Sequence, residues 1–151
     1  MPLDDYEVEI GTVAVRREGT DLTILANMLM LHRALAAAEI LAEEGTSAEV
    51  IDMRSLVPLN LDPVLRSVKK TRRVLIVEED NLTGGWGAEI AARLGEEAFD
   101  SLDAPIQRIA APDTPLPAAP ALEREYVPSI DRILDAARRF GSGGKVKSSK
   151  P

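Results

Sequence analysis

The stretch RVLIVEEDNLTGGWGAEIAARL, residues 73–94, decides the fold. Residues 73–78 form a nearly continuous apolar run, as expected for a β-strand that is covered on both faces. Glycines at positions 84, 85 and 87 then turn the chain into a helix. The apolar residues of that helix recur at helical spacing, at Ile90, Ala91, Leu94 and Ala98. A buried strand, a tight turn and an amphipathic helix predict one unit of a parallel α/β sheet.

The same alternation of strand and helix continues on both sides of this stretch. A helix is expected to open at Asp62, which is predicted to be its N-cap because Pro63 suits the first helical turn. A proline-rich connector, residues 112–120, separates the last strand from the last helix. The other predicted elements are strands at 23–26, 48–52 and 106–110, and helices at 31–42, 64–70 and 130–140.

Helix-length connections between strands imply a largely parallel sheet with helices on both faces, which is a doubly wound α/β fold. Residues 13–16 predict one more strand at an edge of the sheet. Residues 1–12 are interpreted as the remnant of an interdomain linker and residues 13–140 as the domain itself. Residues 141–151, GSGGKVKSSKP, are predicted to be a disordered tail because they cannot bury apolar surface.

Composition excludes several classes of function. The net charge of −7 and the pI near 4.8 disfavour binding to nucleic acid or to anionic membranes, which both require a basic surface. The absence of cysteine removes disulfides and thiolate metal sites, and a single histidine argues against zinc sites and Ser–His–Asp catalysis. No apolar run reaches the roughly 18 to 20 residues of a membrane helix, and the acidic N-terminus is unlike a signal peptide. We therefore expect a soluble cytoplasmic domain.

Three features suggest chemistry, and each also has a structural explanation. The glycine loop at 83–87 could cradle a phosphate, but it lacks the known phosphate-loop patterns and follows three acidic residues, so a structural turn is favoured. Those acidic residues, 78–80, together with Asp52 could bind Mg²⁺ as in a phospho-receiver domain, but the lysine of such domains is not found at residues 109–113. His32 has no partner visible in the sequence and is interpreted as a surface or packing residue.

A cluster of acidic residues lies at a predicted helix end, at Glu96, Glu97, Asp100 and Asp103. It is either a solvated face or a docking patch for Lys and Arg of a partner, because complementary charge speeds association and fixes register. The residues alone do not choose between these two interpretations.

Several segments resemble β subunits of the 2-oxo acid dehydrogenase E1 component. AEVIDMRSLVPL (48–59) resembles VEVIDLRTLSPLD, and VKKTRRVLIVEE (68–79) resembles the family pattern VKKTGRVLVVEE. TGGWGAEI (83–90) is similar to TGGFGAEI. The shorter segments LDAP (102–105), DTPLP (113–117) and YVPS (126–129) follow in the family's order and spacing.

This resemblance implies a three-layer α/β/α domain of the transketolase C-terminal type, with a five-stranded sheet and one antiparallel strand. It also implies that the catalytic parts lie elsewhere. The family's activating glutamate belongs to an N-terminal pyrimidine-binding domain, and its thiamine diphosphate and Mg²⁺ are held by the α subunit. The resemblance therefore assigns this chain no catalytic, cofactor-binding or metal-binding residue, and implies that the chain is inactive in isolation.

The work implied for the domain is assembly. It would join an E1 α subunit and a second β subunit, and would present an acidic surface to the basic subunit-binding domain of the acyltransferase. Asp103 matches the family aspartate of LDAP that pairs with this partner, with Asp100 and Glu97 as weaker neighbours. Met28 stands where the family pattern TYGxMVH has glycine, and Asn60 stands where PLD has aspartate.

Two other functions remain open. One is a free-standing, non-catalytic interaction module that has kept the fold. The other is the C-terminal domain of a transketolase or a deoxyxylulose phosphate synthase. The order of LDAP, DTPLP and YVPS favours the dehydrogenase β pattern, while the choice between pyruvate and a branched-chain 2-oxo acid stays undecided.

Overall fold

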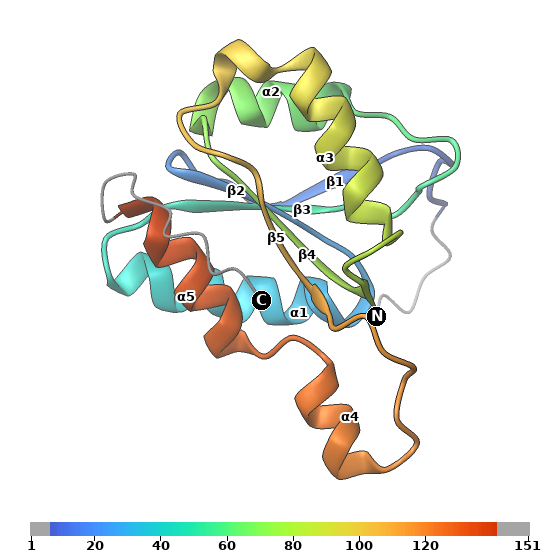
Figure 1. The fold of residues 1–151 in the computed structure, drawn as a ribbon. Coiled ribbons are helices and arrows are strands. Elements are labelled where there is room, and N and C mark those ends of the chain that lie inside the picture. Colours follow the sequence, from blue (N-terminus) through green and yellow to red (C-terminus); the bar gives the residue numbers. More distant parts are fainter. Residues whose placement is uncertain (1–6, 142–151) are drawn as a thin grey trace.

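A five-stranded mixed sheet organises the chain in the computed structural model, which describes residues 7–141 (Figure 1). The strand order is β1-β3-β2-β4-β5. The strands are β1 (Ala14–Arg17), β2 (Leu22–Ala26), β3 (Ala48–Asp52), β4 (Val74–Asn81) and β5 (Gln107–Ala111). β1 pairs antiparallel with β3 at one edge, and the other neighbours are parallel. This confirms the predicted fold class, including the additional edge strand.

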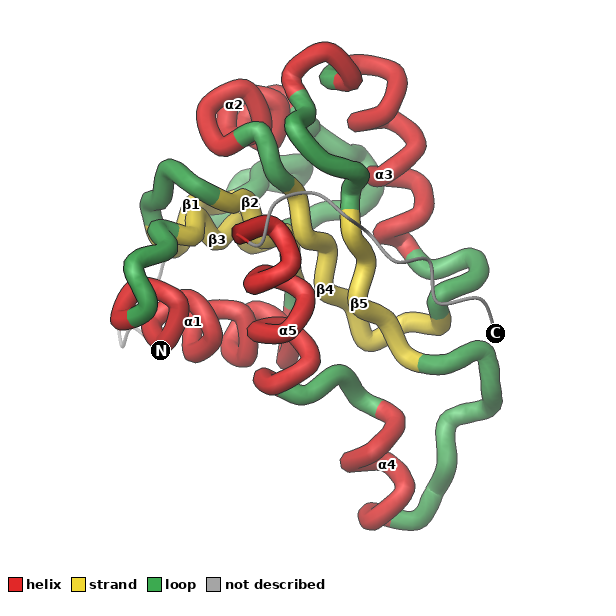
Figure 2. The backbone as a smooth tube through the Cα atoms, turned by 60° about the vertical axis from the view of Figure 1, so that its left-hand side comes forward, coloured by secondary structure: helices red, strands yellow, loops and turns green. Residues whose placement is uncertain are grey.

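Helices cover both faces of the sheet. α1 and α5 pack on one face, and α2 and α3 pack on the other (Figures 1 and 2). The helices are α1 (Met28–Glu43), α2 (Asp62–Thr71), α3 (Trp86–Glu97), α4 (Pro120–Tyr126) and α5 (Ile130–Gly141), with a short 3₁₀ helix η1 (Phe99–Ser101). None of the helices in residues 7–141 is long and apolar enough to span a membrane.

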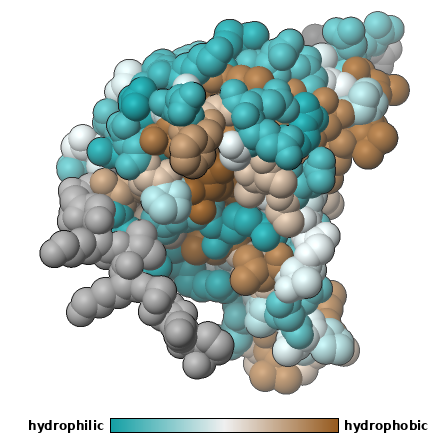
Figure 3. Space-filling model, turned by 45° about the horizontal axis from the view of Figure 1, so that its top comes forward, coloured by the Kyte–Doolittle hydropathy of each residue, from teal (hydrophilic) through white to brown (hydrophobic). Residues whose placement is uncertain are grey.

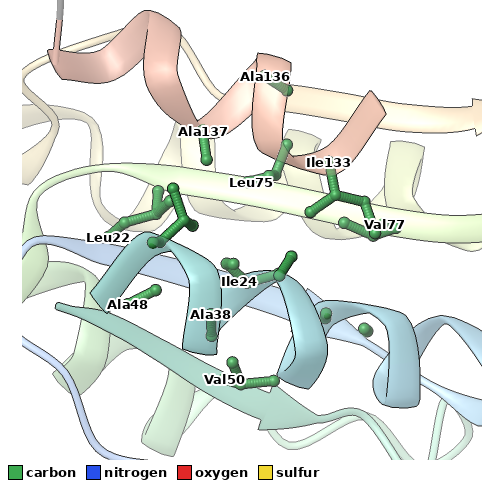
Figure 4. Close-up of a cluster of buried hydrophobic side chains, with 14 of the residues drawn as sticks. Leu22, Ile24, Ala38, Ala48, Val50, Leu75, Val77, Ile133, Ala136 and Ala137 are labelled. Atoms are coloured by element: carbon green, nitrogen blue, oxygen red, sulfur yellow. The ribbon is translucent and has the colours of Figure 1, made fainter. Parts of the chain in front are cut away.

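The core is built mainly from alanine and branched aliphatic side chains, since aromatic residues make up only 3% of the sequence. Under α1 and α5, alanines of the helices meet branched residues of the strands, so the helices approach the sheet closely (Figure 4). Residues labelled there include Ala38, Ala136, Ala137, Ile24, Val50 and Leu75. The opposite face buries Leu25, Ile51, Val64, Ile76, Ile90 and Leu94. Strands buried on both faces explain the continuous apolar runs of the sequence.

The structure corrects two local predictions. Asp62 is the first residue of α2 rather than its N-cap, which is Leu61. The Asn60 side-chain oxygen accepts a hydrogen bond from the Asp62 backbone N–H at 3.0 Å. Asn60, the residue before the N-cap, therefore supplies a side-chain acceptor for the first turn of the helix. In addition, the connector after β5 leads into α4, a short helix that the sequence analysis did not predict.

α4 was missed because its burial is minimal. It begins at Pro120, and Tyr126 is its only buried residue. The Tyr126 hydroxyl donates to the Thr114 carbonyl oxygen at 3.2 Å and ties the helix to the connector. Figure 1 shows this segment projecting away from the layered body. The predicted boundaries of the linker and domain stay predictions, and most of the predicted tail lies outside the described residues.

Candidate partner-binding surface

The three residues predicted to contact a partner lie together at the amino-terminal ends of β4 and β5. Glu97 ends α3, Asp100 lies in η1, and Asp103 follows on the way into β5. α2 ends beside them, because the Asp103 backbone N–H donates to the Arg72 carbonyl oxygen at 2.9 Å. Figure 3 turns this end toward the reader and shows a mainly hydrophilic surface interrupted by smaller apolar patches.

Asp103 already has a cationic partner within the chain. The Arg72 guanidinium reaches its Oδ1 with Nε at 2.8 Å and Nη2 at 2.7 Å. Both side chains are about half-exposed, with 46% and 48% of their surface accessible. The hydrogen bond from Arg72, together with its charge, lowers the pKa of the Asp103 carboxyl. Asp103 is therefore ionised at neutral pH and partly neutralised by its neighbour.

The other two carboxylates differ in their surroundings. Arg93 lies one helical turn before Glu97, and its Nη2 is 2.9 Å from the Glu97 carboxylate. Asp100 is exposed in η1, and no ion pair joins it to another residue of the described chain. The surface is thus less negative than the acidic sequence cluster suggested, since two of its three predicted residues have arginine partners.

An exposed apolar side chain belongs to the same segment of the chain. Phe99 is 73% exposed, although aromatic residues are usually buried. Neither Phe99 nor the two arginines was predicted from the sequence to belong to this surface. The only available signal was the position of Phe99 between Glu97 and Asp100, because Arg72 precedes Asp103 by 31 residues. An aromatic residue within a charged rim is typical of a protein interface.

Arg72 also has an unusual backbone. It is the C-cap of α2 and adopts φ +61°, in the left-handed region that favours glycine. The family pattern VKKTGRV has glycine at this position. Met28, the only other non-glycine residue with positive φ in the described chain (φ +46°), stands where a second family pattern, TYGxMVH, has glycine. At both positions a side chain is kept in a conformation that glycine adopts more easily.

The glycine loop before α3 covers a buried ion pair. Glu78 is fully buried and accepts a hydrogen bond from the Gly87 backbone N–H at 2.8 Å. Arg108 of β5 donates to the same carboxylate, from Nε at 3.0 Å and from Nη2 at 2.5 Å. A Cβ added at Gly85 or Gly87 would lie 2.6 or 2.5 Å from a Glu78 oxygen. The space beneath the loop is filled by a carboxylate, so it cannot cradle a phosphate.

Two of the other carboxylates considered from the sequence, Asp52 and Glu79, are held by internal contacts. Asp52 pairs with Arg16 at 3.1 Å and with Arg54 at 3.4 Å. Glu79 accepts a hydrogen bond from the Leu29 backbone N–H at the start of α1. Within residues 7–141, no three His, Asp or Glu side chains are placed to hold a metal ion. His32 is exposed on α1. Asp52 and Glu79 therefore support the fold rather than a receiver-like Mg²⁺ site.

Comparison with known proteins agrees with this architecture. Residues 11–133 match the family described as transketolase, C-terminal domain. The β subunit of acetoin:2,6-dichlorophenolindophenol oxidoreductase from Cupriavidus necator is 41% identical over 145 residues, which are 96% of this chain and 43% of that protein. The pyruvate dehydrogenase E1 component subunit beta of Leifsonia xyli is 52% identical over 123 residues, which are 82% of this chain and 36% of that protein.

A solved structure shows the same relation. A protein described as "Split gene transketolase, inactive beta4 tetramer" superposes with a TM-score of 0.77 at 32% identity, covering 90% of this chain and 43% of that one. The chain therefore spans less than half the length of these relatives. From the family match and these similarities, the chain belongs to the transketolase C-terminal domain family, and its relatives include E1 β subunits of pyruvate and 2-oxoisovalerate dehydrogenases and β subunits of acetoin oxidoreductases.

Proposed function

We propose that the chain serves as the C-terminal domain of the β subunit of a thiamine-diphosphate-dependent 2-oxo acid dehydrogenase, with roles in subunit assembly and acyltransferase docking. The observation that carries this proposal is the similarity of nearly the whole domain to proteins named as E1 β subunits. Pyruvate and branched-chain 2-oxo acids remain the substrate classes, and the first relatives add acetoin to them. Groups that select among these substrates are expected in the other domains of the enzyme.

The cofactors implied by the family do not fit the residues described here. Thiamine diphosphate needs a phosphate cradle and Mg²⁺, whereas the glycine loop is filled by the Glu78 carboxylate and no metal-binding cluster lies in residues 7–141. We propose that the α subunit and the pyrimidine-binding domain hold both groups. No step of the reaction is assigned to side chains of this domain.

Calorimetric titration of the isolated chain with thiamine diphosphate and Mg²⁺ is expected to give no binding heat. The reason is that the Glu78 carboxylate fills the space beneath the only glycine-rich turn that joins a strand to a helix in the described chain. A titration with Mg²⁺ alone serves as the control for unspecific cation binding. A saturable curve with micromolar affinity for the cofactor would contradict this prediction.

Assembly would use the carboxyl-terminal ends of the strands, opposite the acidic surface. Apolar side chains that would favour burial are exposed in the loops and helix starts after β2, β3 and β4 and in the segment around α4. They are Met28, Leu29, Val57, Leu82, Leu116 and Leu122. The solved relative is described as a "beta4 tetramer", and this description supports contacts between β subunits as one part of the assembly role. The E1 α subunit and a second β subunit are the proposed partners.

Docking is tested through Asp103. We expect Asp103→Asn to weaken binding to the subunit-binding domain of the acyltransferase by about thirtyfold, because it leaves a cation of the partner without its counter-charge. Calorimetry at low and moderate salt measures this effect, and binding by the unchanged chain should fall with salt. Asp131→Asn on α5 is the control, since it removes the same charge from an exposed site far from Asp103. Equal affinities of the two variants would remove Asp103 from the docking surface.

A transketolase C-terminal domain is the second candidate, because the solved relative is named a split-gene transketolase. Reconstitution separates the two candidates. The chain is joined with a pyrimidine-binding domain and an α subunit, and is then assayed with 2-oxo acids plus lipoyl acceptor or with sugar phosphates. Turnover of a 2-oxo acid supports the dehydrogenase proposal, whereas turnover of sugar phosphates alone would replace it. Failure of every reconstitution would favour a free-standing interaction module.

A further inference from the structure

We propose that Arg72 is an internal competitor for the docking carboxylate, so that a cationic group of the partner must replace the Arg72 guanidinium on Asp103. This inference rests on the proposed docking function and adds a regulating residue to it. Two features of Arg72 are not explained by a role in subunit assembly. Arg72 adopts a left-handed backbone conformation at the end of α2, and its side chain lies on the family's docking aspartate.

The geometry indicates that replacing Arg72 on Asp103 has a low free-energy cost. Both contacts of Arg72 reach the same oxygen of Asp103, Oδ1, so neither of them occupies Oδ2 of this half-exposed side chain. Since both side chains are about half-exposed, water already screens their attraction. A partner guanidinium or ammonium can therefore approach Oδ2 first and then displace Arg72, without the desolvation cost of opening a buried ion pair.

The Arg72 side chain can be removed without disturbing the backbone around it. Asp103 is held in place by its own N–H, which donates to the carbonyl oxygen of Arg72 at 2.9 Å, and this bond needs no side chain at position 72. The left-handed conformation suits glycine better than arginine, so Arg72→Gly should fold without strain. The side chain of Arg72 can thus be removed while the carboxylate keeps its position.

The test measures the dissociation constant of the full chain for the acyltransferase subunit-binding domain by calorimetry at low salt. Arg72→Gly is expected to bind about fivefold more tightly. The partner then no longer has to break the Arg72–Asp103 ion pair, which is exposed and therefore of modest strength. Arg72→Gln removes the guanidinium but keeps the side chain at positive φ, and should gain as much. Lys69→Gln removes one positive charge from the last turn of α2 without changing an ion pair of the three docking carboxylates, and should gain clearly less.

The double variant Arg72→Gly/Asp103→Asn identifies the group through which the gain arises, and should bind no better than Asp103→Asn alone. Equal gains for the Arg72 and Lys69 variants would reduce the effect to net charge and overturn the competitor. Weaker binding after loss of Arg72 would instead make it a positioning residue. If Asp103→Asn binds as well as the unchanged chain, the docking proposal fails first, and the absence of binding by every variant overturns both.

Discussion

Replacing Arg108 by methionine should lower the free energy of unfolding by about 3 to 5 kcal/mol, the usual cost of leaving one charge of a buried pair without its partner. Glu78 has no exposed surface, and Arg108 supplies two of the hydrogen bonds that its carboxylate receives. The remaining donor is the Gly87 backbone N–H. Methionine keeps most of the side-chain volume, so the loss reports the charge rather than a cavity.

Urea denaturation at pH 7 measures this loss, and Arg93→Met is the matched control. Arg93 pairs with Glu97 on the surface, where both side chains are more than one-third exposed, so its replacement should cost less than about 1 kcal/mol. A further replacement, Glu78→Gln in the Arg108→Met background, should recover part of the stability because it removes the unpaired charge. Similar losses for Arg108→Met and Arg93→Met would mean that water reaches Glu78.

Much of the fold could be predicted from local sequence. Strand β3 was predicted at residues 48–52 and is found there. The run between Gly45 and Arg54 is too short for a helix, and all five residues of the strand are buried. The edge strand β1 also agrees with its prediction within one residue. What local patterns cannot supply is the pairing of residues far apart in the chain. Glu78 and Arg108 are 30 residues apart, and nothing in either segment identifies the other as its partner.

The candidate surface illustrates the same limit. Its acidic residues were visible as a cluster, and the resemblance selected Asp103 among them. Arg72 belongs to a segment that resembles the family, yet only the fold shows that the end of α2 lies beside Asp103, just before β5. α4 escaped prediction for a different reason, since a helix with one buried residue leaves almost no periodic apolar signal.

Gly19→Ala is expected to destabilise the domain by about 3 kcal/mol, at the upper end of the cost of overpacking. The reason is a close approach of two backbones rather than a special conformation of the glycine. A Cβ at this position would lie 2.2 Å from the Glu49 backbone nitrogen and 2.3 Å from the Ala48 carbonyl carbon. Neither atom can rotate away, because both belong to the backbone of β3, which is paired on both sides with β1 and β2. The turn between β1 and β2 would therefore have to move away from β3.

That movement would also open a buried polar contact, which is why the expected loss is large. The Gly19 backbone N–H donates to the Glu49 carboxylate at 3.3 Å, and Glu49 is buried and paired with Lys70. Gly95→Ala in α3 is the control, since a Cβ there meets nothing within 4 Å and should stabilise the helix by about 0.5 to 1 kcal/mol. Urea denaturation of the two variants should thus shift the midpoint in opposite directions. A Gly19→Ala variant as stable as the unchanged chain would show that β1 and its turn adapt independently of the parallel strands.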